Sequence, residues 1–432
     1  MMLSPIKRKI KNCGRVCRLV LGSLLLILFS SLVTAQTYYT HPISNEVNSL
    51  IVFPDGAPLE APIIALEGGT IVIKFDDMTY GNSNYSYKVV HCNADWTPSE
   101  LASAEYLRGF QENSFDYGTT SQLTTVPYTH YEVRLPNNDV ALTISGNYAV
   151  LIAKDYDYDN PAAVACFSIV EPMVTISGEV SGNTPLGIST HYQMVNFEID
   201  HQNYTVRDPQ REFRVVVMQN RRTDNMVINP RPNYTTFSKE TYRDNRALVF
   251  EGGNEYRTID FSSEYTYGAG INRIEALNNV MHVDLISATP RTPYATPTSG
   301  GDADGRMVIN RQHSDDVDIE ADYMWVHFFL ETNYLPNGSV YLLGDLTGNR
   351  LDPLSQMTYQ QTPTGNGYAC SLYLKQGGYS FQYAFLPKGK TQASLLPIEG
   401  SYWNTENEYI ILVYHRGFGQ RYDRLVGYQI IQ

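Results

Sequence analysis

The sequence predicts an all-β protein built from tandem β-sandwich domains with very little helix. Short runs of alternating or β-branched residues recur along the chain, separated by Gly, Pro, Asn and Asp. Examples are "HYEVRLPNNDVALTISGNYAVLIAK", "EFRVVVMQN" and "YMWVHFFLETN". Tyrosine is twice as frequent as phenylalanine, with 33 against 16 residues, and tyrosine suits half-buried strand surfaces. Long amphipathic helices are missing from the pattern, so we expect sheets to pack on sheets.

The N-terminal segment predicts export. Six basic residues precede the apolar run from Leu19 to Val33, and Val33-Thr34-Ala35 provides small residues before a cleavage point. The run is shorter than the ~20 apolar residues that a membrane-spanning helix needs. We therefore interpret residues 1–35 as a signal peptide cleaved after Ala35, and we expect a soluble, exported mature protein.

The charge balance disfavours nucleic-acid binding. Cleavage would leave 432 − 35 = 397 residues. Because the leader holds six basic and no acidic side chains, the net charge would become −13 − 6 = −19. A phosphate-binding surface needs clustered Lys and Arg, which this sequence does not show. With 43% hydrophobic residues the chain can build several cores, and its length suggests two to four domains.

A histidine beside a cysteine in "VVHCNADWTPSE" suggests catalysis at first sight. The preceding run predicts a strand, and successive side chains on a strand point to opposite faces. His91 and Cys92 therefore cannot act together as base and nucleophile, and we expect them to serve packing and hydrogen bonding. The stretch Thr97–Glu100 combines a capping hydroxyl, a proline and a glutamate, which predicts a short helical turn.

Three cysteines remain after the leader: Cys92, Cys166 and Cys370. An odd number excludes a fully paired set within one chain. Cys92 and Cys166 both lie in strand-like runs and could bridge the two sheets of the first domain. Buried free thiols are the alternative that we favour.

Alternating carboxylates at Asp155, Asp157 and Asp159 resemble a calcium-binding loop. The sixth and twelfth positions of that loop lack the glycine and glutamate that an EF-hand needs. An acidic hairpin turn between strands that end near Lys154 and restart near Ala163 explains the same residues. Both interpretations stay open.

Proline-rich and turn-rich stretches divide the mature chain. Glu171-Pro172 interrupts two strand runs, and a stretch rich in Pro, Thr and Gly follows Ser287. The resulting prediction is a first β-sandwich domain at 36–172, a second at 173–286, a linker or long loop at 287–305 and a C-terminal domain at 306–432. Within the loop, Asp302–Gly305 predicts a D-G turn.

In the C-terminal unit, "VYLLGDLTGNRLDPL" and "GYACSLYLKQGGYSFQY" resemble the early-set, immunoglobulin-like sandwiches related to glycogen-binding modules. The turn Gly344–Asn349 lacks the tryptophan on which a sugar ring would stack. The resemblance implies an early-set-like sandwich. Glycan binding by this unit would require an exposed aromatic platform near Tyr341, Tyr379 or Trp403.

Signatures of catalysis and of metal binding are weak. Paired carboxylates for glycoside hydrolysis could be chosen from Glu105, Glu112 and Asp116, but no spacing in sequence fixes their separation in space. The nine histidines show no H-x-H or H-E-x-x-H spacing, and neither a G-x-S-x-G elbow nor a Gly-rich phosphate loop occurs. We expect no catalytic, cofactor-binding or metal-binding residues, and we predict that the protein is not an enzyme.

A longer resemblance indicates a function. "HCNADWTPSELASAEYLRGFQEN", with "VPYTHYEVRLPNNDVALTISGNYAV" after it, resembles the first domain of the type IX secretion system plug proteins. The similarity continues through "FEIDHQNYTVRDPQREFRVVVMQNRR" and "DIEADYMWVHFFL" and spans nearly the whole mature chain in order. The region from Pro290 to Gly305 departs most.

The resemblance implies a non-enzymatic periplasmic protein that lies at the inner face of the outer membrane. Its partner would be the very large outer-membrane β-barrel of the type IX translocon, whose periplasmic end it would close when no cargo is being exported. The residues that contact this partner are not identified by the sequence, and neither a cofactor nor a small-molecule substrate is expected. The competing hypothesis is a periplasmic or surface glycan-binding β-sandwich protein.

Overall fold

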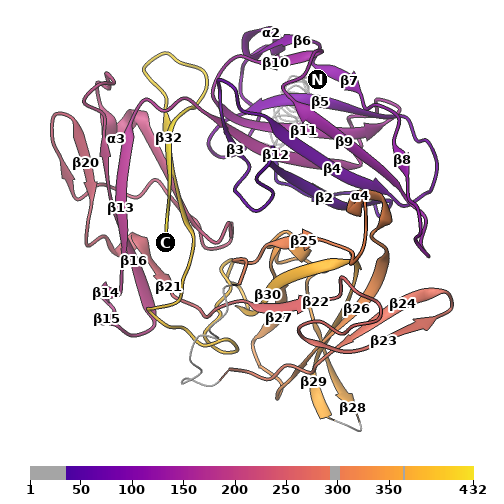
Figure 1. The fold of residues 1–432 in the computed structure, drawn as a ribbon. Coiled ribbons are helices and arrows are strands. Elements are labelled where there is room, and N and C mark those ends of the chain that lie inside the picture. The colour runs from indigo at the N-terminus through magenta and orange to yellow at the C-terminus, as the bar shows by residue number, and fades with distance from the viewer. Residues whose placement is uncertain (1–35, 292–301, 363–364) are drawn as a thin grey trace, which may run out of the picture. The chain divides into compact units, whose positions relative to one another are not determined.

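A computed structural model describes residues 36–291, 302–362 and 365–432 (Figure 1). The described chain is almost entirely β-structure, which confirms the predicted fold class. Its α-helices are α2 (Ser103–Tyr106), α3 (Pro209–Glu212) and α4 (Val317–Glu320), each of four residues, and its 3-10 turns are η1 (Arg246–Leu248) and η2 (Asp345–Thr347). The predicted signal peptide and residues 292–301 of the predicted linker lie outside the described residues.

The first sandwich packs a four-stranded sheet against a six-stranded one. The four strands are β2 (Val47–Pro54), β4 (Ile71–Asp77), β9 (Thr129–Leu135) and β8 (Thr119–Thr120), in that order. The larger sheet contains β1 (His41–Pro42), β12 (Ala163–Val170), β11 (Gly146–Lys154), β5 (Tyr85–Cys92) and β7 (Glu112–Ser114), with β3 (Ile63–Ala65) parallel to β12. A small ribbon of β6 (Leu107–Gly109) and β10 (Val140–Leu142) lies beside α2. Phe75 and Tyr131 stack at 5.2 Å in the core between the sheets.

The second sandwich contains strands from two distant parts of the chain. One sheet has the order β13 (Thr175–Ser181), β16 (Tyr192–Asp200), β20 (Lys239–Tyr242) and β19 (Tyr234–Thr235), with β21 (Val249–Glu251) also on β16. A ribbon of β14 (Asn183–Thr184) and β15 (Gly187–Ile188) adjoins it. The other sheet has the order β18 (Val227–Ile228), β17 (Phe213–Gln219), β31 (Tyr409–His415) and β32 (Arg424–Ile431). The last two strands of the chain therefore complete this sandwich.

The third sandwich is inserted into the second, between β21 and β31. One sheet contains β22 (Arg257–Asp260), β30 (Gly377–Pro387) and β25 (Met307–Ile309), with β27 (Gly338–Leu343) also on β30. The other has the order β23 (Ile271–Leu277), β24 (Val280–Leu285), β26 (Tyr323–Glu331), β29 (Gly365–Lys375) and β28 (Thr358–Thr362). Phe261 and Tyr379 stack at 5.4 Å in its core.

Strand pairing thus crosses the predicted division between 173–286 and 306–432. The reason lies in β31, whose seven residues "YIILVYH" are all buried. Its Tyr409, Ile411 and Val413 face the core of the second sandwich. The alternate residues join a cluster that also contains Ala61 and Val170 of the first sandwich. A strand that is apolar on both faces needs cover on both, and the position beside β17 provides it, with one cluster on each face.

The corner after β5 differs from the sequence prediction. β5 itself confirms the predicted strand, but no helical turn occurs at Thr97–Glu100, and α2 begins only at Ser103. The Thr97 backbone NH and hydroxyl instead donate to Asp95 Oδ1 at 3.1 and 2.6 Å, which forms a local turn. The capping glutamate is Glu105, whose carboxylate accepts a 2.8 Å hydrogen bond from the Ala102 NH.

Candidate functional site: domain junctions and exposed loop tips

His91 and Cys92 are not a catalytic pair. His91 is fully buried against Tyr148, and its Nδ1 lies 2.9 Å from Ser99 Oγ. Cys92 lies on the opposite face of β5, in a separate apolar cluster. Burial lowers the pKa of His91 to about 4 and raises the pKa of Cys92 to about 12. A thiolate nucleophile needs the opposite electrostatic environment.

The thiols of Cys92 and Cys166 are free, which corrects the alternative of a bridge between sheets. Both residues lie in the same sheet, on β5 and β12, with β11 between them. Two strand spacings amount to about 9–10 Å, whereas the Cα atoms of a disulfide are about 4.4–6.8 Å apart. Cys370 is also free.

The acidic residues singled out in the sequence have local partners. Glu105 pairs with Arg421, and Glu112 pairs with Lys88 at 2.9 Å. Asp116 is exposed on the loop after β7. The carboxylates Asp155, Asp157 and Asp159 lie in the turn between β11 and β12, which end and restart at Lys154 and Ala163 as the hairpin interpretation predicts.

The turn at Asp302–Gly305 also matches its prediction. Asp304 and Gly305 have positive φ, and the Arg306 NH donates to the Ala303 carbonyl at 2.8 Å. The Asp304 carboxyl is partly buried. Burial, together with the charge of Asp302, raises its pKa to about 6.

Of the three aromatic residues expected near a sugar platform, only Trp403 is exposed, at 43%. Tyr341 and Tyr379 are 8% and 3% exposed and belong to the interior of the third sandwich. An aromatic pair that the sequence analysis did not identify lies on β26 and β29. There Trp325 is 38% exposed and lies 5.1 Å from the ring of Tyr373.

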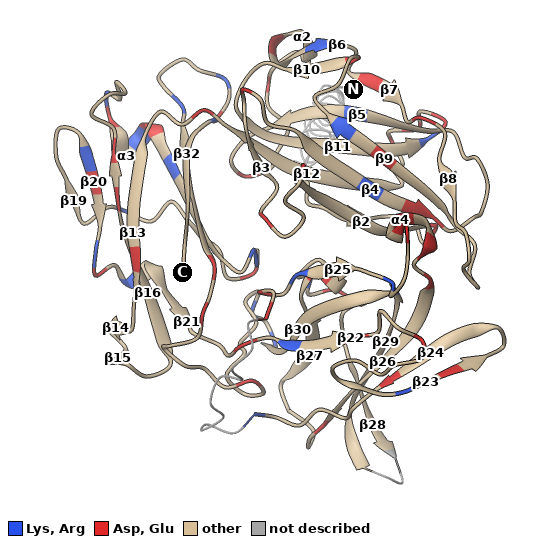
Figure 2. Cartoon of the chain, viewed as in Figure 1, with Lys and Arg blue, Asp and Glu red and all other residues tan. Residues whose placement is uncertain are grey.

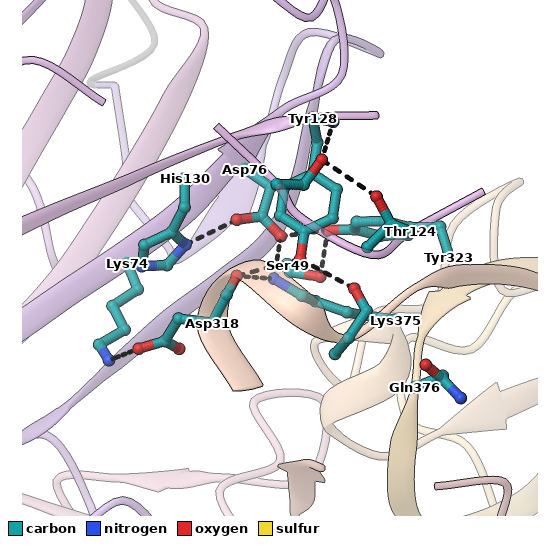
Figure 3. Close-up of polar contacts among 12 residues, drawn as sticks. Ser49, Lys74, Asp76, Thr124, Tyr128, His130, Asp318, Tyr323, Lys375 and Gln376 are labelled. Carbon is teal, nitrogen blue, oxygen red and sulfur yellow. Dashed lines mark hydrogen bonds and ion pairs between the residues drawn. The ribbon is translucent and has the colours of Figure 1, made fainter. Parts of the chain in front are cut away.

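The junction between the first and third sandwiches is centred on Asp76 at the end of β4 (Figure 3). Its buried carboxylate accepts hydrogen bonds from Lys375 Nζ at 2.6 Å and from the Tyr323 hydroxyl at 2.7 Å, both from the third sandwich. His130 Nδ1, on the neighbouring strand β9, lies 2.7 Å away. Lys375 Nζ also lies 4.2 Å from the centre of the Tyr128 ring. The carboxylate thus has partners both across the junction and on the neighbouring strand.

A second buried carboxylate, Asp322, fixes the same junction. It accepts backbone hydrogen bonds from Thr125 at 2.7 Å and Val126 at 3.0 Å, both in the loop before β9. The Thr125 hydroxyl adds a further hydrogen bond. Backbone NH groups stabilise an ionised carboxylate without a counter-charge. Asp322 therefore orders a first-sandwich loop against the third sandwich.

Lys74 and α4 form the outer part of this junction. Figure 2 marks the acidic residues of α4 in red. Lys74 Nζ lies 2.5 Å from Asp318 Oδ2 of α4 and 3.2 Å from Glu132 Oε2 of β9. Burial lowers the pKa of Lys74, but the Asp318 hydrogen bond and charge outweigh it and raise the pKa overall. Ligand atoms of His130, Glu132 and Asp318 lie within 4.8 Å of one another, and these residues could hold a metal ion.

All three sandwiches meet at Glu408 and the carbonyl of Leu59. Arg306 donates to Glu408 at 2.7 Å and to the Leu59 carbonyl at 3.2 Å. Arg221 donates to the same two groups at 3.3 and 2.7 Å. Burial and the charge of Arg306 lower the pKa of Arg221 to about 10. The three sandwiches are thus joined by buried polar contacts in addition to the chain itself.

Several loop tips expose large apolar side chains. Phe237, in the β19–β20 hairpin, is fully exposed, and Phe418, in the β31–β32 hairpin, is 95% exposed. Other exposed residues of this kind are Phe110, Tyr117, Leu123, Tyr234 and Tyr265. Exposed aromatic side chains are common at protein interfaces, so these tips are candidate partner contacts.

Sequence reasoning missed the junction residues Asp76, Asp322 and Lys375. The only available signal was polar residues that interrupt or end apolar runs, as in "IVIKFDD" and "SLYLKQ". Such residues are common at strand ends, and the partner of each lies hundreds of positions away.

The described residues contain no helix that is long and apolar enough to cross a membrane. No curated protein matches the chain. A crystal structure of a hypothetical protein from Parabacteroides merdae ATCC 43184 is 40% identical in sequence, with a TM-score of 0.88. The match covers 91% of this chain and 99% of that one.

The family model described as type 9 secretion system plug protein, 1st domain, matches residues 47–171, which hold every strand of the first sandwich except β1. This match concerns a secretion component and no known enzyme family. The chain therefore belongs to the type 9 secretion system plug protein family, and its role is in type IX secretion.

Proposed function

We propose that this protein is a non-enzymatic periplasmic plug of the type IX translocon. It closes the periplasmic end of the giant outer-membrane β-barrel when cargo is not being exported, and it contacts the membrane only through that barrel. The family match of the first sandwich is the observation that carries this proposal. A barrel wide enough for folded cargo also passes solutes, so an idle barrel needs a physical obstruction.

The joined sandwiches support an obstructing role. Asp76 with Lys375, Asp322 with the Thr125 loop, and Glu408 with two arginines connect the sandwiches through buried contacts. Domains linked only by flexible tethers would move apart and leave gaps, whereas buried ionic contacts favour one arrangement.

The exposed loop tips support reversible binding. Phe237 and Phe418 offer isolated aromatic contacts in polar surroundings. Large continuous apolar interfaces are typical of permanent complexes, so small separate contacts suit a complex that must dissociate. We propose that such tips bind the translocon barrel and that neither nucleic acid nor a small-molecule substrate is involved.

The decisive experiment is an affinity isolation of the tagged full-length protein from its detergent-solubilised native envelope, followed by mass spectrometry. We expect the translocon barrel in near-stoichiometric amount. The variants Phe237→Ser and Phe418→Ser should recover less barrel at unchanged melting temperature, with Asp159→Asn in the exposed β11–β12 turn as the matched control.

A strain that lacks the protein should admit more large antibiotic or dye through its outer membrane. Unchanged entry in that strain, or an isolation that never contains the barrel, would refute the plug proposal.

Trp325 and Tyr373 support a second candidate, glycan binding, because an exposed tryptophan beside a half-buried tyrosine can stack on a sugar. The full chain titrated with α- and β-glucans should then show quenching of tryptophan fluorescence that Trp325→Ala abolishes. Absence of any binding would remove this candidate and leave the plug proposal unaffected.

A further inference from the structure

The imidazole of His130 is oriented as metal-binding imidazoles are. Its Nδ1 lies 2.7 Å from Asp76 Oδ1, and Asp76 is held in turn by Lys375 and Tyr323. An ionised carboxylate can only accept a hydrogen bond, so Nδ1 carries the hydrogen, and in the neutral imidazole the lone pair is on Nε2. Metal-ligating histidines characteristically donate their other nitrogen to a carboxylate in this way.

The free nitrogen of His130 is a buried polar atom without a hydrogen-bond partner among the described residues. A buried acceptor that makes no hydrogen bond costs about 1–3 kcal/mol, so its presence calls for an explanation. Glu132 lies two positions further along β9, on the same face of the strand, and Asp318 approaches from α4 of the third sandwich.

These three side chains bring one nitrogen and two carboxylate ligands within 4.8 Å of one another, and no other such group occurs in the described parts of the chain. Imidazole together with carboxylates suits first-row divalent ions such as Zn²⁺, and three protein ligands leave a coordination position for water. The two carboxylates also supply the negative charge that a divalent ion neutralises.

The two carboxylates already hold a cation in this structure, since the Lys74 ammonium lies between them at 2.5 and 3.2 Å. The side chain of Lys74 is 17% exposed, and its flexible stem reaches solvent. A divalent ion at this place must displace the ammonium, so Lys74 and the ion compete for the same carboxylates.

We propose that His130 Nε2, Glu132 and Asp318 form a binding site for a divalent first-row transition ion of the Zn²⁺ type, which takes the place of the Lys74 ammonium. The bound ion ties α4 of the third sandwich to β9 of the first. This inference is independent of the plug proposal, because it concerns ion binding by the isolated chain.

The test uses the full mature chain without an affinity tag, stripped of metal by a chelator. Zn²⁺ is titrated in competition with a chromophoric chelator, and the melting temperature is recorded with and without the ion. We expect one ion per chain and a higher melting temperature. His130→Gln and Glu132→Gln should each weaken binding at least about tenfold, since each removes a ligand.

Lys74→Met gives a prediction of opposite sign, because removal of the competing ammonium should tighten Zn²⁺ binding several-fold. Damage to the junction alone cannot increase the affinity for Zn²⁺. Lys74→Met therefore still tests the proposal if His130→Gln fails to fold. Glu132 is 30% exposed and also accepts from Arg134, so its amide replacement should leave the metal-free melting temperature nearly unchanged.

The matched controls are His282→Gln and Cys370→Ser. His282 belongs to a pair of histidines away from the proposed site, with His327 Nε2 at 2.8 Å from its Nδ1, and Cys370 is a free thiol. Both controls should bind Zn²⁺ as the unaltered chain does. The proposal is overturned if His130→Gln and Glu132→Gln bind with unchanged affinity, if Lys74→Met does not bind more tightly, or if a control variant removes the ion.

Discussion

Lys375 of the third sandwich lies 2.6 Å from Asp76 of the first, and both side chains are almost completely buried. The two residues are 299 positions apart in the chain. The Asp76 carboxylate is further compensated by the hydroxyl of Tyr323, and the Lys375 ammonium by the ring of Tyr128. Removal of the Lys375 ammonium would leave the Asp76 carboxylate without its cationic partner from the third sandwich, in a site that is almost completely buried.

We therefore expect Lys375→Met to lower the free energy of unfolding by about 3–5 kcal/mol, the usual cost of breaking a buried ion pair. Urea unfolding of residues 36–432 measures this loss. The control is Lys88→Met, which breaks the more exposed pair with Glu112 and should cost about 0–1 kcal/mol. Equal losses in the two variants would show that the Asp76 junction contributes no more than a surface pair.

His91 should stay neutral well below the range in which histidines usually titrate. Burial lowers its pKa to about 4, against about 6.5 in an unfolded chain. The unfolded state therefore binds the proton first. The contribution of the buried neutral His91 to the free energy of unfolding is complete above pH about 6.5 and is lost as the pH falls toward about 4. NMR of the imidazole should show no midpoint between pH 7.5 and 5, and a midpoint near 6.5 would contradict the buried geometry.

Asp304 should make the fold less stable at neutral pH than at mildly acidic pH. Its pKa is raised to about 6 by burial and by Asp302, so the folded chain holds this proton more tightly than the unfolded one. The stabilising contribution is complete below pH about 4 and is lost as the pH rises to about 6. Asp304→Asn should remove that loss and stabilise the protein at pH 7 by about 1–2 kcal/mol, after allowance for solvent screening.

Urea midpoints at pH 4.5 and 7 measure the effect of Asp304→Asn, with Asp159→Asn in the exposed acidic turn as the control. If the two variants show the same pH dependence, Asp304 does not titrate as its position implies.

Cys92 and Cys166 should resist modification in the folded protein. Burial raises the pKa of both thiols, and thiolate is the reactive form. An aromatic disulfide reagent should therefore react with Cys370 before the other two, and all three should react after unfolding in urea without a reductant. Detection of only one reactive thiol in the unfolded chain would reveal a disulfide and require β5 and β12 to be placed differently.

Local features were predictable from the sequence because their causes are local. The strand at Tyr85–Cys92, the hairpin turn after Lys154 and the D-G turn at Asp304-Gly305 depend on alternation and on turn residues within a few positions. The prediction of a helical turn at Thr97–Glu100 was wrong because Thr97 donates its hydrogen bonds to Asp95 instead of capping a helix.

The long-range arrangement was not predictable in the same way. The run "YIILVYH" indicates a strand that is buried on both faces, but it does not indicate that its neighbour is β17, almost 200 positions earlier. The junction depends on pairs such as Asp76 with Lys375, for which a single sequence contains no pairing signal. The candidate metal ligands likewise meet only because α4 packs beside β9.

The insertion of the third sandwich into the second has a consequence for the order in which the sandwiches can form as the chain is made from its N-terminus. The first sandwich has all its strands once residue 170 has been made, and the third once residue 387 has been made. The second must wait for β31 and β32, although its first strand, β13, was made more than 200 residues earlier. A chain truncated shortly before Tyr409 would therefore contain every strand of the third sandwich but would lack β31 and β32 of the second.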